Sequence, residues 1–219
     1  MARETEIKLR ITELAGFRRA LAKLGLRGAA VGSRRVHEFN ILFDTAAKSL
    51  KKRGQLLRIR TESPATKAQR YNGKNHTEQA TLTFKSPVGE RGKGRGSGAR
   101  HKVREELEVE VSDREALASI FQGLGMQPWF RYEKFRTKYH LSKAQRWAKK
   151  LVIDLDETPI GTFVELEGPA GAIDRAAKAL GFTKRGYIVA NYFVLYLAEC
   201  RRRGEEPGDM LFAKRKRRR

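Results

Sequence analysis

The sequence predicts an α+β fold in which eight antiparallel strands close into a barrel with helices packed outside. Three observations support this expectation. Eight segments alternate charged residues with apolar or β-branched ones at the period of a strand. Helical spacing occurs in fewer segments, and three of the expected helices follow a charged strand and stop at a Leu-Gly pair. These repeats are too irregular in length for a solenoid, so one sheet closed on itself fits them better.

The first strand shows the alternation most clearly. Glu4, Glu6, Lys8 and Arg10 share one face, because successive side chains of an extended chain point to opposite sides. The other face carries Thr5, Ile7, Leu9 and Ile11. One face of this strand therefore combines carboxylates, which suit metal ions, with cationic groups, which suit anions.

Seven further segments each have one charged face and one apolar face. They are 36–43, 57–62, 81–85, 104–111, 134–139, 153–156 and 164–167. We expect the charged faces to point into the barrel and the apolar faces to lie outside beneath helices. This reverses the usual small barrel, whose interior is filled by side-chain packing. The alternative is that the charged faces are solvated, which any single strand of this kind would favour.

Four helices are expected between and after the strands. Thr12 can cap the first, and Ser112 or Asp113 can cap the second. The third covers 170–180, and the first three stop at Gly25, Gly125 and Gly181. The fourth covers 188–200, whose apolar and aromatic residues predict packing against the core.

The composition predicts a globular, strongly basic protein. The 219 residues carry a formal net charge of +22, which attracts polyanions such as nucleic acid or polyphosphate. Cys200 is the only cysteine, which excludes an internal disulfide and a cysteine-rich zinc site. No apolar run has the length of a transmembrane helix. We therefore expect a cytoplasmic protein that does not enter membranes.

The charge distribution suggests two parts. Residues 1–200 form the expected barrel domain, and residues 201–219 form a basic tail expected to be disordered and able to contact nucleic acid. The glycine-rich basic stretch 89–98 is expected to form a mobile flap. The two tryptophans, Trp129 and Trp147, are interpreted as packing residues rather than platforms for stacking bases.

The charged strands also carry short motifs in a fixed order. They are Glu4-Thr5-Glu6-Ile7-Lys8, Leu57-Arg58-Ile59-Arg60, Thr83-Phe84-Lys85-Ser86-Pro87, Arg104-Glu105-Glu106-Leu107-Glu108, Lys134-Phe135-Arg136, Asp156-Glu157 and Gly161-Thr162-Phe163-Val164-Glu165-Leu166-Glu167. With this set, residues 2–198 resemble the CYTH superfamily of triphosphate tunnel metalloenzymes. That group includes class IV adenylyl cyclases, thiamine triphosphatases and inorganic triphosphatases.

The resemblance implies an eight-stranded antiparallel tunnel with a divided set of site residues. Mg²⁺ or Mn²⁺ would be bound by carboxylates, namely Glu4, Glu6, Asp154, Asp156, Glu165 and Glu167, with help from Glu106 and Glu108. Cations would hold the triphosphate, namely Lys8, Arg58, Arg60, Lys85, Arg104, Lys134 and Arg136. Of these, the catalytic residues would be Lys8, Lys85 and Arg136. Strand phase places both aspartates on one face, so it does not choose between them.

The same charges suit more than one reaction. The motifs 83–87 and 104–108 favour a class IV adenylyl cyclase, which converts ATP to cyclic AMP and pyrophosphate. The alternative within the family is hydrolysis of tripolyphosphate or thiamine triphosphate at the terminal phosphate. A third hypothesis, suggested by the net charge, is a non-catalytic module that binds polyphosphate or nucleic acid. A homodimer is a further expectation.

Overall fold

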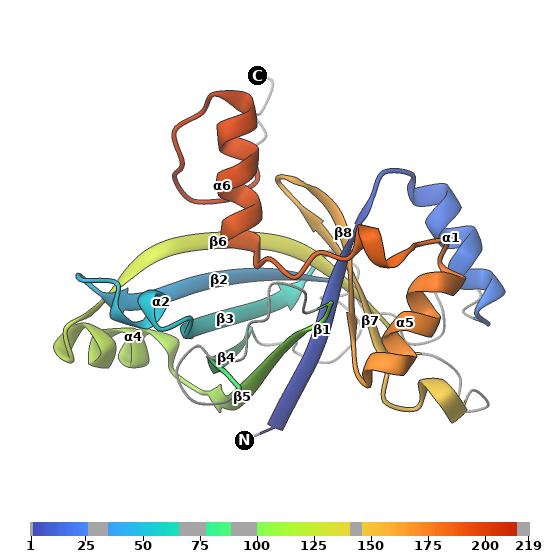
Figure 1. Ribbon diagram of the computed structural model, residues 1–219. Helices are drawn as coiled ribbons and strands as arrows, with labels where there is room; N and C mark the ends of the chain where they lie inside the picture. The colour runs from blue at the N-terminus through green and yellow to red at the C-terminus, as the bar shows by residue number, and fades with distance from the viewer. Residues whose placement is uncertain (1, 26–34, 66–77, 89–99, 141–145, 214–219) are drawn as a thin grey trace.

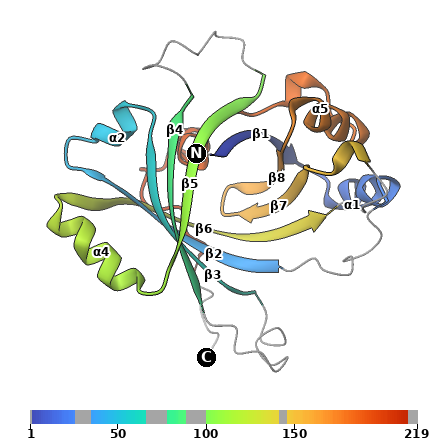
Figure 2. The same ribbon diagram turned by 90° about the horizontal axis from the view of Figure 1, so that it is seen from below.

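The eight predicted strands are present and close into one antiparallel barrel (Figure 2). The computed structural model describes residues 2–25, 35–65, 78–88, 100–140 and 146–213. Around the barrel the strands follow the order β1-β5-β4-β3-β2-β6-β7-β8, and β8 pairs with β1. Their bounds are Ala2–Ile11, Arg35–Thr45, Leu56–Pro64, Gln79–Pro87, Lys102–Val111, Met126–His140, Val152–Thr158 and Gly161–Glu167 for β1 to β8. The predicted α+β barrel is therefore confirmed.

The expected reversal of barrel polarity is clearest at β1. Ile7 and Leu9 point away from the interior, yet neither is exposed, because α1 (Leu14–Lys23) and α5 (Ala170–Ala179) cover that face. Both helices lie on the same side of the barrel (Figures 1 and 2). Phe17 of α1 and Ile173 of α5 belong to the same apolar cluster as the β1 residues. Burial of this outer face leaves the inner face free for charges.

The opposite side of the barrel is covered less completely. The helix α4 (Arg114–Gly123) packs Phe121 against the outer residues Phe43 and Ile59, and the short α2 (Ser49–Lys52) lies nearby. The outer face of β5 remains partly open, with exposed side chains at Val103, Leu107 and Val109. The expectation that helices cover the outer faces thus fails at β5 in the described part of the chain.

The helix ends correct one detail of the sequence analysis. Glu13, rather than Thr12, caps α1, because its carboxylate accepts hydrogen bonds from the first free backbone N–H groups, those of Ala15 and Gly16. Asp113 caps α4 in the expected way. The three glycines expected after the helices all have positive φ values, namely Gly25, Gly125 and Gly181.

The C-terminal helix begins and ends later than the expected range 188–200. The helix α6 (Tyr192–Arg203) stands on one end of the barrel (Figure 1). The boundary expected after residue 200 therefore falls inside a helix. Beyond it, Met210 is fully buried, and its backbone N–H donates to the carbonyl of Arg131 at 2.9 Å. The segment after α6 is thus held on the barrel at Met210, because this apolar side chain interrupts the basic stretch, while residues 201–209 are exposed.

The remaining elements are short or lie outside the described residues. Two 3₁₀ helices, Arg146–Ala148 and Lys184–Gly186, connect longer elements. The last basic run, 214–219, and the expected flap, 89–98, lie outside the described residues. No helix in the described ranges has the length and apolarity needed to span a membrane.

Candidate active site inside the barrel

The barrel encloses a cavity of about 580 Å³ lined by inward-facing charged side chains. All predicted site residues except Asp156 line it, namely Glu4, Glu6, Lys8, Arg58, Arg60, Lys85, Arg104, Lys134, Arg136, Asp154, Glu165 and Glu167. These residues come from seven of the eight strands, from β1 near the start of the chain to β8. The interpretation of the charged faces as solvated surface is therefore wrong for these strands.

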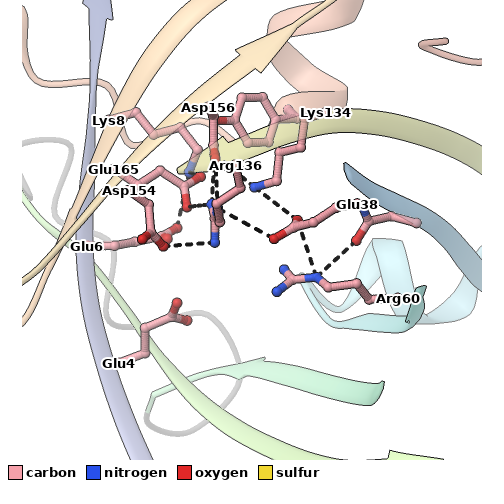
Figure 3. A network of polar contacts seen from close by, with 12 residues as sticks. Glu4, Glu6, Lys8, Glu38, Arg60, Lys134, Arg136, Asp154, Asp156 and Glu165 are labelled. Atoms are coloured by element: carbon pink, nitrogen blue, oxygen red, sulfur yellow. Dashed lines mark hydrogen bonds and ion pairs between the residues drawn. The ribbon is translucent and has the colours of Figure 1, made fainter. Parts of the chain in front are cut away.

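Arg136 of β6 lies at the centre of the charged side chains (Figure 3). Its Nε and Nη2 atoms each donate to the Asp156 carboxylate at 2.7 Å, a bidentate pairing that fixes the guanidinium plane. The same group contacts Asp154 at 3.0 Å and also binds Glu165. Burial alone would lower the pKa of Arg136, but the surrounding carboxylates hold it well above its usual value.

Glu38 of β2 is a site residue that the sequence analysis did not single out. It is fully buried, and its carboxylate lies 3.4 Å from Arg60 Nε, 3.4 Å from Lys134 Nζ and 3.5 Å from Arg136 Nε. Burial would raise the pKa of Glu38, but these cations outweigh that effect and lower it. Glu38 therefore acts as a shared counter-ion for three cations, which we call the cationic cluster (Arg60, Lys134 and Arg136).

Asp156 lies behind the cavity wall and has three donors. Besides Arg136, it accepts hydrogen bonds from Lys134 Nζ at 2.8 Å and from the Tyr192 hydroxyl at 2.6 Å. Tyr192 belongs to α6, and its ring also lies 5.3 Å from Lys8 Nζ. The apolar pattern of 188–200 predicts only core packing for this tyrosine, so its contact with the site was not expected. Asp156 and Tyr192 thus link α6 to the cationic cluster.

Lys8 joins two carboxylates of neighbouring strands. Its Nζ lies 3.3 Å from Glu6 and 3.2 Å from Glu165. Burial disfavours the charged lysine, yet both carboxylates raise the pKa of Lys8 above its ordinary value. Glu6 also binds Lys102, a residue missed because the predicted strand began two residues too late. Burial and the nearby Lys8 lower the pKa of Lys102 to about 8.

A second group, which we call the acidic cluster, consists of Glu4, Glu106 and Glu167 on adjacent strands. Lys85 lies between two of its members, 2.7 Å from Glu4 and 3.0 Å from Glu106. Burial and the negative charge of Glu4 raise the pKa of Glu167 to about 7. Burial also raises the pKa of Glu106 despite Lys85, with Glu4 adding to the effect. The acidic cluster thus has more negative charge than its surroundings compensate.

The two remaining predicted cations also face the cavity. Arg58 donates to Thr83 Oγ1 at 3.0 Å and to the Tyr132 hydroxyl at 3.2 Å, and lies 3.6 Å from Glu108. Arg104 lies opposite Glu4 in the β1–β5 register and is buried. The side chains predicted for phosphate contact are therefore on the same cavity as the carboxylates.

The carboxylates are not arranged as a finished metal site. Among the described residues, no three Asp, Glu, His or Cys side chains are placed to share one ion. Lysines and Arg136 contact these carboxylates instead. Two observations nevertheless fit a hard cation: the Asp154 Oδ1 atom is buried without a hydrogen bond, and the pKa of Glu167 is raised by burial and by the like charge of Glu4. The donor set consists of oxygen atoms, as Mg²⁺ and Mn²⁺ prefer.

The structure thus defines a closed antiparallel barrel whose interior cavity is lined by charged side chains. The family to which the chain belongs follows from a model match. The CYTH domain model matches residues 2–182, and the chain is a member of the CYTH domain family. The resemblance inferred from the ordered motifs is thereby confirmed.

Solved structures with the same fold come from several organisms. A Pyrococcus horikoshii protein superposes with a TM-score of 0.62 at 22% identity, over 90% of this chain and 99% of that one. A candidate adenylate cyclase from Vibrio parahaemolyticus gives 0.60 at 14% identity, over 88% and 96%. A candidate adenylyl cyclase from Hippeastrum, described as having a dominant triphosphatase activity, gives 0.52 at 21% identity, over 93% and 97%. At these identities the likeness shows the fold. No curated protein matches the sequence.

Proposed function

We propose that this protein is a divalent-metal-dependent enzyme that acts on a triphosphate inside the barrel, as a class IV adenylyl cyclase that converts ATP to cyclic AMP and pyrophosphate. The observation that carries the proposal is the lining of the cavity, which combines buried cations and buried carboxylates. A module that only bound polyanions would gain nothing from carboxylates facing its ligand, because they repel it. The carboxylates have a use if metal binds with the triphosphate.

The proposed roles follow from the position of each charge. The cations on the cavity would neutralise the phosphate chain, and Lys8, Lys85 and Arg136 would stabilise the charge that develops on transfer. The carboxylates proposed as metal ligands are Glu4, Glu6, Asp154, Glu165 and Glu167. Asp156 takes a different role from the one expected from the sequence, because its oxygens already accept from three donors behind the wall. It would hold Lys134 and Arg136 in place.

The mechanism requires charge neutralisation and a positioned nucleophile. The chemistry that Mg²⁺ or Mn²⁺ supplies when bound is polarisation of phosphate oxygens and neutralisation of their charge. In the cyclase reaction the ribose 3′-hydroxyl attacks the α-phosphorus, the bond from this phosphorus to the oxygen that bridges it to the β-phosphate breaks, and pyrophosphate leaves. Arg136 would meet the phosphate with a fixed guanidinium plane, because Asp156 already orients it. Arg58, oriented by Thr83 and Tyr132, would do the same from β3.

The cyclase branch is supported by the segments whose motifs resemble it. Residues 83–87 lie on β4 and residues 104–108 on β5, and the two are paired from Thr83–Glu108 to Pro87–Arg104. The second proposal is hydrolysis of the terminal phosphate, in which water replaces the ribose hydroxyl as nucleophile. Both reactions would use the same charged walls, so the product distinguishes them.

The test is a turnover assay with Mg²⁺ or Mn²⁺ on ATP, tripolyphosphate and thiamine triphosphate. We expect cyclic AMP and pyrophosphate from ATP, and we expect Glu4→Gln and Glu6→Gln to lower kcat by about 10²-fold or more. Glu157→Gln is the matched control and should leave kcat unchanged, because Glu157 pairs with Arg35 on the half-exposed surface. Free phosphate instead of cyclic AMP would favour the hydrolase. Unchanged turnover in both site variants would contradict metal-dependent catalysis at these residues.

A further inference from the structure

The cavity is charged at one end and apolar at the other. Along β6 the side chains that line it change from Arg136 and Lys134 to Tyr132 and then Phe130. The neighbouring strands β2 and β3 also present apolar side chains to this part of the cavity, namely Leu42 and Leu56. Leu42 pairs with Phe130 in the β2–β6 register. The cations proposed to bind phosphate therefore lie at one end of a longer space, and its other end is lined mainly by apolar side chains together with Asp44 and Lys51.

Aromatic rings and one lysine form the wall of the apolar end. Trp129 and Phe193 both line the cavity, and their ring centroids lie 4.8 Å apart with an interplanar angle of 80°. Lys51 Nζ lies 4.5 Å from the Phe193 centroid and 5.2 Å from that of Trp129. Both rings are only partly buried. Trp129 thus packs against Phe193, as expected from the sequence, and also presents part of its surface to the cavity.

We propose that this aromatic end binds the planar organic group of the triphosphate substrate, so that the substrate is an organic triphosphate and not inorganic tripolyphosphate. The inference rests on the proposed function, since it assumes that the charged end holds the phosphates. A cavity of about 580 Å³ has the size of sites that enclose drug-sized organic ligands. Aromatic side chains stack on heterocyclic rings. The charged end of the cavity therefore matches a triphosphate chain, and the aromatic end matches a planar ring joined to that chain.

The competing explanation is that these rings only anchor α6 on the barrel. Phe193 and Leu195 both belong to the apolar cluster beneath that helix, but only Phe193 lines the cavity. Leu195→Ala therefore removes a packing contact of α6 without changing the proposed ring site. It serves as the matched control for Phe193→Ala.

The first test compares ATP, thiamine triphosphate and tripolyphosphate as substrates of the full-length protein. We expect the wild type to turn over tripolyphosphate more slowly than an organic triphosphate. Phe193→Ala should raise KM for at least one organic triphosphate roughly tenfold and should change the residual turnover of tripolyphosphate by less than about twofold. Leu195→Ala should affect the substrates equally. Equal effects of Phe193→Ala on organic and inorganic substrates would overturn the proposal.

The second test measures binding and does not depend on turnover. The chain has two tryptophans, so Trp147→Phe leaves Trp129 as the only one. We expect its fluorescence to change on titration with ATP or thiamine triphosphate in Mg²⁺, and not with tripolyphosphate. The same response to all three ligands, or none to an organic triphosphate shown to bind by calorimetry, would overturn the ring site. Absence of turnover with every substrate would instead contradict the proposed function.

Discussion

The cationic cluster and the acidic cluster lie on the same cavity but differ in how their charges are compensated. Each member of the cationic cluster is paired with a buried carboxylate, and Glu38 alone contacts all three. In the acidic cluster, Lys85 contacts Glu4 and Glu106, and the pKa of Glu167 is still raised to about 7 by burial and by Glu4. The cationic cluster is thus held in its charged form, whereas the acidic cluster has too few cations to balance its carboxylates.

The difference teaches how a charged interior can be stable without a ligand. Oriented cations need buried counter-ions, because an unpaired charge in the interior is costly. Carboxylates near the cavity can instead remain partly protonated, because water reaches them and their pKa can rise. The fold therefore fixes the geometry of the proposed phosphate contacts, whereas the acidic cluster keeps an excess of negative charge that a bound cation would relieve.

The largest effect should come from removing the counter-ion of the cationic cluster. Glu38→Ala leaves three cations without their shared carboxylate, and we expect the free energy of unfolding in urea at pH 7 to fall by roughly 3–5 kcal/mol. Glu157→Ala is the control, because Glu157 pairs with Arg35 at 2.8 Å on the half-exposed surface. That variant should lose about 1 kcal/mol or less.

A second substitution protects this test against a variant that does not fold. Glu38→Gln keeps the shape of the side chain and removes only its charge. It should lose less than the alanine variant but more than Glu157→Ala. Equal losses for Glu38→Gln and the surface control would show that the cationic cluster does not depend on this carboxylate.

A smaller effect is expected where α6 joins the cationic cluster. Tyr192→Phe removes the hydroxyl that donates to Asp156 at 2.6 Å, and a hydrogen bond to a charged group contributes about 1.5–3 kcal/mol. Tyr196→Phe is the matched control, since its hydroxyl donates to the carbonyl of Asp209 at 3.3 Å in an exposed position. Urea unfolding of both variants measures the difference. A loss as small as that of the control would mean that Asp156 does not need this donor.

These residues also show how far the sequence can predict the site. Period-two alternation fixes which side chains share a face, so the charges at Glu4, Lys8, Lys134 and Arg136 were assigned to the interior correctly. Glu38 was on the same predicted face. Its contacts with Arg60, Lys134 and Arg136 could not be predicted, because they arise from the position of β2 between β3 and β6. The order of the strands along the chain does not reveal which strands are neighbours in the barrel.

Contacts from helices were harder to predict than contacts within the barrel. Tyr192 follows Asp156 by 36 residues and reaches it from a helix whose pattern predicts only core packing. The choice between Asp154 and Asp156 likewise depends on depth, because both share one strand face but only Asp154 lines the cavity. Helix caps at Glu13 and the burial of Met210 depend on local geometry that composition does not resolve.

The smallest expected effect tests the charge deficit of the acidic cluster. The pKa of Glu167 rises from an ordinary value of 4.5 to about 7 in the folded protein. Between these two values the folded state binds more protons than the unfolded state, so the stability of the metal-free protein falls as the pH rises through this window. Glu167→Gln removes the titration. In EDTA, the Tm of the variant minus that of the wild type should therefore be largest above pH 7. Below pH 4.5 Glu167 is protonated in both states, and the remaining Tm difference should reflect only the changed packing of the side chain.

The sign of this pH dependence distinguishes the acidic cluster from the cationic cluster. The change in Tm should be small, because water screens the charges at this partly open site. Glu13→Gln provides a control of opposite sign, because backbone amides of α1 lower the pKa of Glu13 and make its charged form stabilising. Relative to the wild type, that variant should lose Tm as the pH rises toward about 4.5 and stay lower by a constant amount above it. If Glu167→Gln behaved in the same way, the cations of the cavity would compensate Glu167 fully, and the acidic cluster would not differ from the cationic cluster.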